Sequence, residues 1–335
     1  ADDPTGPVGL DHVILESTYG ATARVPLDSK ARRTILANEL KAAHAAGGPL
    51  LIPAFAVERT QELLVDLLDL METTEAPPGP IFVDSPLAIK ACDIFLRRGH
   101  LESGENPFRS LRESRLLQFT ESYSESRDLA RLKGWHVIVA ASGMCDAGRV
   151  RGHLRRLLPR EDATVMIVGY QAVGTLGRLL VEGTRSVRIQ GDDVAVRARI
   201  RNIDIYSGHA DAAALNRWID ARAPIAGTVF LDHGEPASLS ALQTRLSSAG
   251  LAQNQVVIAA LDQTYRLTHG AKADVLPTAP SRVPANALAR LDWHNARAAF
   301  LTRLQERLET MPDDAKREAL LAKLEVGLSR SAAFS

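Results

Sequence analysis

The sequence predicts an α/β protein built on a parallel sheet, and three observations support this class. Short apolar runs recur through the first half of the chain, and each is followed by a stretch with helical periodicity. The runs are continuously apolar, as are the strands of a parallel sheet that is covered on both faces. Of the 335 residues, 45% are hydrophobic and 24% are charged, which suits a globular chain of about two domains.

Five strands are expected in the first half of the chain. They are "HVILES" (12–17), "PLLIPAF" (49–55), "PIFVDS" (80–85), "HVIVAAS" (136–142) and "TVMIVG" (164–169). Amphipathic stretches such as "SKARRTILANELKAAHAAGG" and "VERTQELLVDLLDLMET" lie between them, and the first ends on Gly47 and Gly48, a common helix stop. This alternation predicts parallel strands joined by right-handed crossovers.

The pattern changes after residue 190. In "VAVRARIRNIDIYS", Arg197, Arg199 and Arg201 alternate with apolar residues, which predicts a half-buried strand with a basic face. A strand, a helix and a strand follow in "TVFLDH", "ASLSALQTRLSSAG" and "QVVIAAL". The Pro-rich segment "PTAPSRVP" then leads to helical stretches around "NARAAFLTRLQERLE" and "AKREALLAKLEVGL". We expect these helices to form an appendage that packs on the domain or on a partner.

Charge and cysteine content bound the class of protein. Lys plus Arg and Asp plus Glu number 40 each, so a nucleic acid would have to bind a local groove. The two cysteines, Cys92 and Cys145, lack CxxC spacing and suit a reduced, cytoplasmic protein. No apolar run approaches the roughly 18 residues of a membrane span, and no signal-peptide pattern opens the chain. The first residue is Ala1, in a loop-like stretch, so we expect the chain to begin partway through a larger protein.

Polar or glycine-containing loops follow all five expected strands. They are "ESTYG", "FAVERTQEL", "DSPLA", "ASGMCDAGRVRGHL" and "VGYQAVGTLGRLL". The carboxyl ends of parallel strands meet at one edge of the sheet, where ligands bind. A single loop of this kind is more often a tight turn, but five on one edge predict a cleft.

The residues of these loops suit a phosphodiester backbone. Glycines permit close backbone approach, and Arg149 and His153 are four apart, hence on one helix face. For Arg155 and Arg156 a solvated helix face is the preferred interpretation. The candidate substrate-binding residues are Thr18, Arg59, Ser142, Gly143, Arg149, Tyr170, Gly174 and Arg178. Such a line of cations and backbone amides favours a single-stranded nucleic acid.

A nucleotide-binding phosphate loop is considered and excluded. Gly169 and Gly174 have the spacing of that motif, but Thr175 and Leu176 stand where it needs Lys and then Ser or Thr. The G-x-G-x-x-G dinucleotide fingerprint is absent as well. No nucleotide cofactor is therefore expected.

Two histidines of the second half stand at positions suited to chemistry. His209 lies in "SGHAD", where it could act as a phosphate donor or general acid. Asp211 is in place to start the helix "AAALNRWID", and a carboxylate bonded to the other His209 nitrogen would hold the tautomer. His233 ends an apolar strand and precedes Gly234, which suits a metal ligand. Alone, His209 is more often a turn residue, and one histidine cannot hold a zinc ion, which needs three or four protein ligands.

Seven segments in order give a family resemblance. "ESTYG", "LIPAFAVERTQELL", "DSPLA", "ASGMCDAGRVRGHL", "VGYQAVGTLGRLL", "SGHAD" and "VFLDHGE" resemble the metallo-β-lactamase-fold nucleases with a β-CASP domain, over residues 8 to 270. The chain is most similar to the bacterial RNA-processing exonuclease branch, which is related to the pre-mRNA cleavage endonuclease subunit. The resemblance implies a Rossmann-like parallel-sheet β-CASP domain inserted in the C-terminal part of an αββα metallo-β-lactamase fold. The expected divisions are 1–20 (a lactamase strand), 21–195 (β-CASP), 196–272 (C-terminal lactamase part) and 273–335 (linker and helical tail).

The resemblance also implies roles for individual residues. Glu16 matches the motif A acid, His209 motif B and His233 motif C, so the resemblance implies that Glu16 and His209 are catalytic and that His233 is a zinc ligand. Asp211, which stands two residues after His209, is the third expected catalytic residue. His at motif C is typical of RNA-processing members, whereas DNA-repair members typically carry Val. The HxHxDH motif, which supplies most ligands of the two zinc ions in this family, is absent. We therefore expect a fragment that lacks the N-terminal zinc-binding half and is inactive alone; a gene product that needs another chain and a degenerate member of the family are the alternatives.

The expected function is that of a zinc-dependent ribonuclease on single-stranded RNA, with exonucleolytic and endonucleolytic modes both open. One alternative is a non-catalytic RNA-binding or scaffold protein that docks through its helical tail. The other is a DNA exonuclease of the same fold. No membrane partner is expected, a homodimer is left open, and no partner is assigned to the tail.

Overall fold

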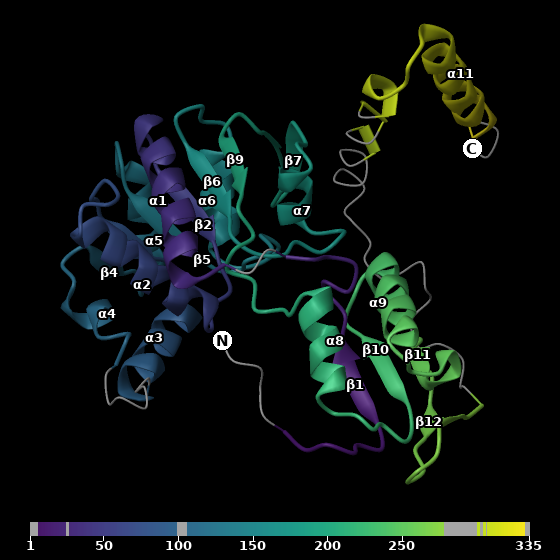
Figure 1. Cartoon of the computed structure of the whole chain (residues 1–335). Helices are drawn as coiled ribbons and strands as arrows, with labels where there is room; N and C mark the ends of the chain where they lie inside the picture. The colour runs from purple at the N-terminus through teal and green to yellow at the C-terminus, as the bar shows by residue number, and fades with distance from the viewer. Residues whose placement is uncertain are drawn as a thin grey trace.

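The computed structural model describes residues 6–24, 27–98, 106–277, 300–301, 304–305 and 307–331. Within them, the chain forms two parallel sheets with helices, as Figure 1 shows. Among the described residues, no helix is both long and apolar enough to cross a bilayer.

The larger sheet has six parallel strands in the order β4-β3-β5-β2-β6-β9. Their bounds are β2 (Leu50–Pro53), β3 (Ile81–Val83), β4 (Leu117–Phe119), β5 (Val137–Ala140), β6 (Thr164–Ile167) and β9 (Arg199–Asn202). Four of these strands were expected from their apolar runs. The edge strand β4 was missed, because its residues are only partly buried and carry no continuous apolar run.

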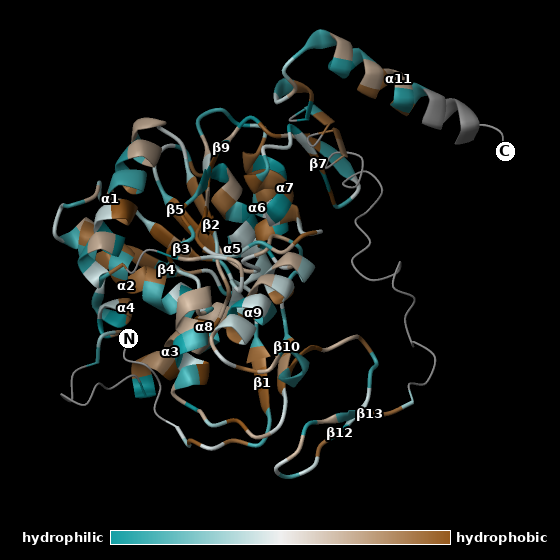
Figure 2. Ribbon diagram, turned by 45° about the vertical axis from the view of Figure 1, so that its right-hand side comes forward, coloured by the Kyte–Doolittle hydropathy of each residue, from teal (hydrophilic) through white to brown (hydrophobic). Residues whose placement is uncertain are grey.

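Helices cover both faces of this sheet because strand side chains alternate in direction. Leu50 and Ile52 of β2 pack into the core under one set of helices, whereas Leu51 packs into the core on the opposite face. The first set is α1 (Ser29–Ala45), α2 (Arg59–Glu72), α3 (Pro86–Arg98) and α4 (Ser110–Glu113). The second core is formed with α6 (Val150–Leu157), α7 (Leu176–Val181) and the 3₁₀ turn η1 (Leu129–Arg131), which follows α5 (Tyr123–Asp128). The central strands are therefore covered on both faces, and Figure 2 shows them as hydrophobic.

The smaller sheet pairs a strand near the start of the chain with two strands that follow the larger sheet in sequence. It has three parallel strands in the order β1-β10-β11, namely β1 (Val13–Glu16), β10 (Val229–Asp232) and β11 (Val256–Ile258). Helices α8 (Ala212–Asp220) and α9 (Pro236–Ser248) pack with these strands in one core. Figure 1 shows the purple β1 beside the green β10, so the larger sheet is inserted in sequence between two neighbouring strands. This is the expected insertion topology.

The basic strand differs from the expectation. The structure divides it into β8 (Asp192–Ala195), which forms a hairpin with β7 (Ser186–Ile189), and β9, which pairs in parallel with β6. Arg201 pairs with Glu39 of α1, and Arg199 donates to the Ala42 carbonyl oxygen (3.2 Å). Because β9 pairs with β6, the larger sheet continues past residue 195. Arg199 and Arg201 of β9 have their partners on α1 and not in the smaller sheet.

The remaining elements lie after the second sheet. A 3₁₀ turn, η2 (Gln253–Gln255), precedes β11, and β12 (Tyr265–Arg266) pairs with β13 (Asp274–Val275) in an antiparallel hairpin. The second expected tail helix is present as α11 (Asp314–Ser331). The linker from 278 and much of the first expected tail helix lie outside the described residues.

Candidate active site

The carboxyl ends of strands from both sheets meet around one cluster of side chains. Glu16 is the last residue of β1, His233 follows β10, and His209 lies on the segment that runs from β9 to α8. One ligand atom from each of these side chains lies within 4.8 Å of the others. The structure therefore brings together three expected residues that are far apart in the sequence.

Strand pairing explains why Glu16 and His233 meet. Glu16 pairs with Asp232 in the register of β1 and β10, so the loops that follow both strands begin side by side. Gly234 permits their close approach, since a Cβ atom there would lie 2.7 Å from the carbonyl oxygen of Ser17. His233 itself adopts a left-handed backbone (φ 51°), and its N–H donates to the Asp232 carboxylate (2.7 Å).

The Thr18 hydroxyl contacts both imidazole rings. Its hydroxyl oxygen is 3.2 Å from His209 Nδ1 and 3.1 Å from His233 Nδ1, and the hydroxyl also faces the His233 carbonyl oxygen (3.1 Å). The rings stack with centroids 5.3 Å apart. Thr18 is buried, so the structure gives this expected substrate-binding residue the task of spacing the two histidines.

Glu16 presents one engaged and one unpartnered oxygen to the cluster. Oε2 accepts from the Thr18 N–H (2.8 Å) and lies 3.3 Å from His209 Nδ1. Oε1 is buried, and no hydrogen-bond partner reaches it from the described residues. A buried carboxylate oxygen without a partner is costly unless a ligand satisfies it. Together with the His233 imidazole it offers nitrogen and oxygen donors of the kind that zinc prefers, so the cluster fits a zinc ion.

The sequence suggested that Asp211 could hold the His209 tautomer, but the structure places its carboxylate elsewhere. It is the N-cap of α8, where its carboxylate accepts from the N–H groups of Ala214 (2.8 Å) and Arg24 (2.9 Å). Burial opposes ionisation, but these backbone hydrogen bonds hold the pKa of Asp211 below its ordinary value. The unsatisfied N–H groups at the start of α8 compete for this carboxylate, and Glu16 occupies the position beside His209 Nδ1.

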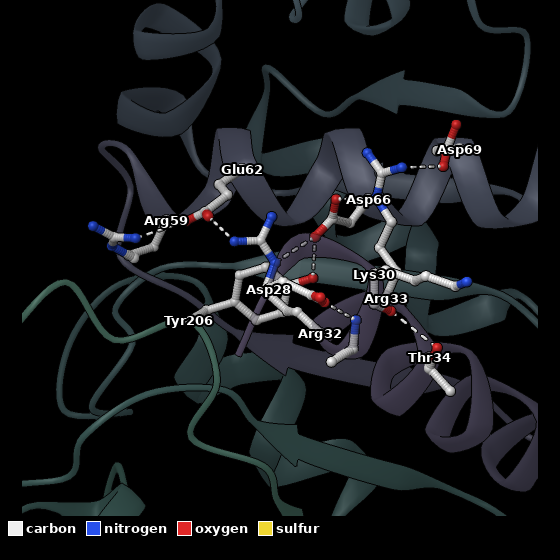
Figure 3. A network of polar contacts seen from close by, with 11 residues as sticks. Asp28, Lys30, Arg32, Arg33, Thr34, Arg59, Glu62, Asp66, Asp69 and Tyr206 are labelled. Carbon is white, nitrogen blue, oxygen red and sulfur yellow. Dashed lines mark hydrogen bonds and ion pairs between the residues drawn. The ribbon is translucent and has the colours of Figure 1, made fainter. Parts of the chain in front are cut away.

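A polar network that sequence reasoning missed supports the segment carrying His209 (Figure 3). The Tyr206 hydroxyl donates to Asp66 of α2 (2.7 Å), and Arg32 of α1 donates to the same carboxylate (2.9 Å). Arg32 also pairs with Glu62, which in turn accepts from Arg59 (2.6 Å). Because Asp66 and Tyr206 are buried, the position of this segment depends on helices of the larger sheet.

The loop that follows β1 also holds this segment, at a residue two positions before Tyr206. Asp204 accepts a hydrogen bond from the Tyr19 hydroxyl (2.7 Å), and Arg24 donates to the Asp204 carbonyl oxygen (2.5 Å). The guanidinium of Arg24 also lies over the Tyr19 ring, 4.9 Å from its centroid. The segment that carries His209 is therefore fastened to both sheets.

Three expected substrate-binding residues lie near this segment or in the neighbouring turns. Arg59 packs directly against Gly208, where a Cβ atom would lie 2.5 Å from Nη2. Ser142 donates its N–H to the Ala147 carbonyl oxygen (3.1 Å), and Gly143 packs against the Phe55 ring. Gly143 and Ser142 thus shape a turn, while Arg59 stands beside the loop of His209.

Tyr170 and Arg178 contact the loop that follows His233. The Tyr170 hydroxyl donates to Glu235 (2.5 Å), and Arg178 lies 3.6 Å from the same carboxylate oxygen. Gly174, between them in sequence, has φ +92°, a conformation that favours glycine. These residues connect the larger sheet to the smaller one beside the histidine cluster.

Arg149 differs from the expectation of a groove cation. Its guanidinium pairs with the fully buried Asp84 (2.7 Å) and donates to the carbonyl oxygens of Thr120 and Glu121 (both 2.8 Å). His153 also contacts Asp84, at 2.6 Å. Arg149 and His153 share a helix face, as expected, but Asp84 draws both inward and their polar atoms hold the loops after β3 and β4.

Comparison with known proteins places these features in a family context. A Beta-Casp domain model matches residues 60–180, and a Zn-dependent metallo-hydrolase RNA specificity domain model matches residues 193–259. Ribonuclease TTHA0252 of Thermus thermophilus is 34% identical over 74% of this chain and 57% of its own length. The RNase J-like protein of Methanocaldococcus jannaschii is 31% identical over 68% of the chain and 52% of its own length.

A third relative carries a different name. Transcription termination factor FttA of Cenarchaeum symbiosum is 29% identical over 68% of the chain, which is 37% of that protein. The chain spans about half the length of the curated relatives it matches.

Proposed function

Since the chain belongs to the β-CASP metallo-β-lactamase family of RNA-processing nucleases, we propose that it acts as a zinc-dependent ribonuclease that hydrolyses single-stranded RNA. The observation that carries this proposal is the meeting of Glu16, His209 and His233 at the edge of both sheets. The match to an RNA specificity domain supports RNA as the substrate. Similarity to a bacterial ribonuclease supports the bacterial branch of the family.

In the proposed reaction each side chain of the cluster has a separate task. Zinc, when bound, supplies an activated water at neutral pH and neutralises phosphoryl oxygens. His233 would hold the metal through its imidazole. Glu16 Oε2, 3.3 Å from His209 Nδ1, would orient that ring so that its other nitrogen can donate a proton to the leaving oxygen. Thr18 would keep the two rings apart.

We further propose that the metal centre is completed by an upstream segment with the HxHxDH motif. Besides His209, which is assigned to proton donation, the described residues bring the unpartnered Glu16 Oε1 and the His233 imidazole to this site, whereas two zinc ions need more ligands. The smaller sheet supports the proposal: β1 stands at its edge, and Ile14 is 75% exposed there. Parallel strands are normally covered on both faces, so a further layer over β1 would be typical of the fold. This chain alone would then bind RNA without cleaving it.

The substrate class is tested with matched single strands. We expect the chain to bind a fluorescently labelled RNA oligonucleotide at least about tenfold more tightly than DNA of the same sequence, a difference of about 1.4 kcal/mol. Fluorescence anisotropy measures both affinities. Cleavage of the same strands is measured with a protein that includes the upstream segment. Equal affinity and cleavage for DNA would support the DNA exonuclease alternative, and RNA binding with no cleavage by the longer protein would support the scaffold.

His233→Ala is expected to weaken zinc binding by at least about a hundredfold in the protein with the upstream segment, because a ligand is lost from the metal. Zinc content after dialysis against a competing chelator is the measurement. His269→Ala is the matched control, since His269 is exposed and pairs with Asp11 away from the cluster. Full zinc content in the His233 variant would remove this residue from the ligand set.

A further inference from the structure

A single oxygen of Glu235 accepts two hydrogen bonds from the larger sheet and lies near a guanidinium of the same sheet. The Tyr170 hydroxyl lies 2.5 Å from Glu235 Oε1, the Val173 N–H lies at 3.3 Å, and the Arg178 guanidinium at 3.6 Å. All three donors belong to the loop that follows β6 and the start of α7, whereas Glu235 belongs to the loop that follows β10. We name these three donor groups, of Tyr170, Val173 and Arg178, the Tyr170 cradle. The anion that they contact, Glu235, follows a strand of the smaller sheet.

The Glu235 side chain does not cap the helix that it precedes. It is the N-cap residue of α9, but its carboxylate makes no capping hydrogen bond there. N-cap side chains normally accept from the first free N–H groups of the helix. The carboxylate contacts the larger sheet and not the helix that it precedes.

The cradle has the composition of a phosphate site. A guanidinium, a backbone N–H and a hydroxyl are donors that proteins direct at phosphodiester oxygens. Glu235 and Arg178 are 31% and 34% exposed at their side chains, so solvent and ligands can reach them. Glu182 and the Gln171 carbonyl oxygen hold the Arg178 side chain in place without Glu235 (2.6 Å and 3.4 Å).

We propose that Glu235 stands in for a backbone phosphate of RNA, which displaces it from the Tyr170 cradle when the strand binds. The inference rests on the proposed function, because it assigns a further binding site to the same substrate. A carboxylate and a phosphodiester each carry one negative charge and accept hydrogen bonds, so the exchange keeps Arg178 neutralised. Glu235 follows His233 by two residues, and the cradle therefore adjoins the histidine cluster. While Glu235 occupies the cradle, the strand binds less tightly than the donors alone would allow.

Binding of a labelled single-stranded RNA to the full chain tests the exchange without any need for cleavage. We expect Glu235→Ala to tighten RNA binding about three- to tenfold, since the competing anion is removed from its donors. Glu235→Gln should give a smaller gain, because its amide oxygen can still accept from Tyr170. The gain should disappear when Arg178→Gln is added to Glu235→Ala, which a double-mutant cycle measures.

The matched control is Glu161→Gln, which changes the net charge equally. Glu161 is exposed and precedes β6, hence it lies at the opposite edge of the larger sheet from the cradle. Melting temperatures of all variants show whether each is folded.

The outcomes separate this inference from the proposed function. RNA binding that is unchanged or weaker in the folded Glu235→Ala variant would overturn the exchange while leaving a ribonuclease intact. An equal gain in Glu161→Gln, or a gain that survives Arg178→Gln, would also overturn it, because the effect would then lie outside the cradle. Absence of RNA binding in the wild type and in every variant would overturn both.

Discussion

His209→Ala is expected to lower RNA turnover by about 10²–10⁴-fold in a protein that includes the proposed upstream segment, with its zinc content unchanged. The reason is the geometry of the ring. Nδ1 faces Glu16 Oε2 at 3.3 Å and the Thr18 hydroxyl at 3.2 Å, so Nε2 is left for proton donation to the leaving oxygen. Loss of a positioned general acid removes this contribution but leaves metal ligands in place.

Single-turnover cleavage of RNA and zinc analysis of the same samples measure both quantities. His269→Ala again serves as the control. Loss of zinc together with activity would show that His209 is a metal ligand. Its ring atom lies within 4.8 Å of the Glu16 and His233 ligand atoms, which would explain that result. Unchanged turnover would contradict its role altogether.

Arg149→Met is expected to lower the free energy of unfolding by about 3–5 kcal/mol, because it leaves Asp84 as a buried charge with a missing partner. Asp84 is fully buried and accepts from Arg149 (2.7 Å), His153 (2.6 Å) and Ser126 (2.5 Å). Chemical denaturation measures the change. Arg155→Met is the matched control on the same helix: its partner Asp192 is exposed, and such pairs contribute about 0–1 kcal/mol.

The pH dependence of stability gives a second measurement on Asp84. Burial opposes its ionisation, but hydrogen bonds from His153, Ser126 and Arg149 hold its pKa below the ordinary value of 3.8. A carboxyl whose folded pKa lies below its unfolded pKa stabilises the fold above the unfolded value, and this stability is lost as the pH falls through the folded pKa. We expect this loss at acidic pH to be shallower in Arg149→Met. A variant of unchanged stability that no longer binds RNA would instead return Arg149 to the substrate-binding residues.

Ordered motifs located the candidate site better than any single residue did. Glu16, His209 and His233 were expected together because seven segments matched in order, and the structure brings their ligand atoms within 4.8 Å. Asp66 could not be found this way. It lies in an amphipathic helix, where a carboxylate normally belongs to the solvated face, and only the packing of α1 and of Tyr206 against it shows that it is buried.

The contacts of Arg149 and Asp211 differ from the expected ones for a common physical reason. Arg149 and His153 were correctly placed on one helix face, since that follows from the helical period. The helical period does not show which part of the protein packs against that face. The partner is Asp84, which lies 65 residues from Arg149 in the sequence. Asp211 was assigned to His209 because it is close in sequence, whereas the free N–H groups of α8 and Arg24 hold its carboxylate.

The sequence by itself determined the α/β class and most strands of the larger sheet, and the family resemblance of its ordered motifs implied the insertion after β1. These properties depend on local apolar runs, turn residues and motif order, all of which are written along the chain. Only the tertiary structure decided that β9 pairs with β6, that Arg149 is enclosed, and that Glu235 crosses to Tyr170. Each of these depends on which distant partner satisfies a strand edge or a buried charge, and packing in three dimensions makes that choice.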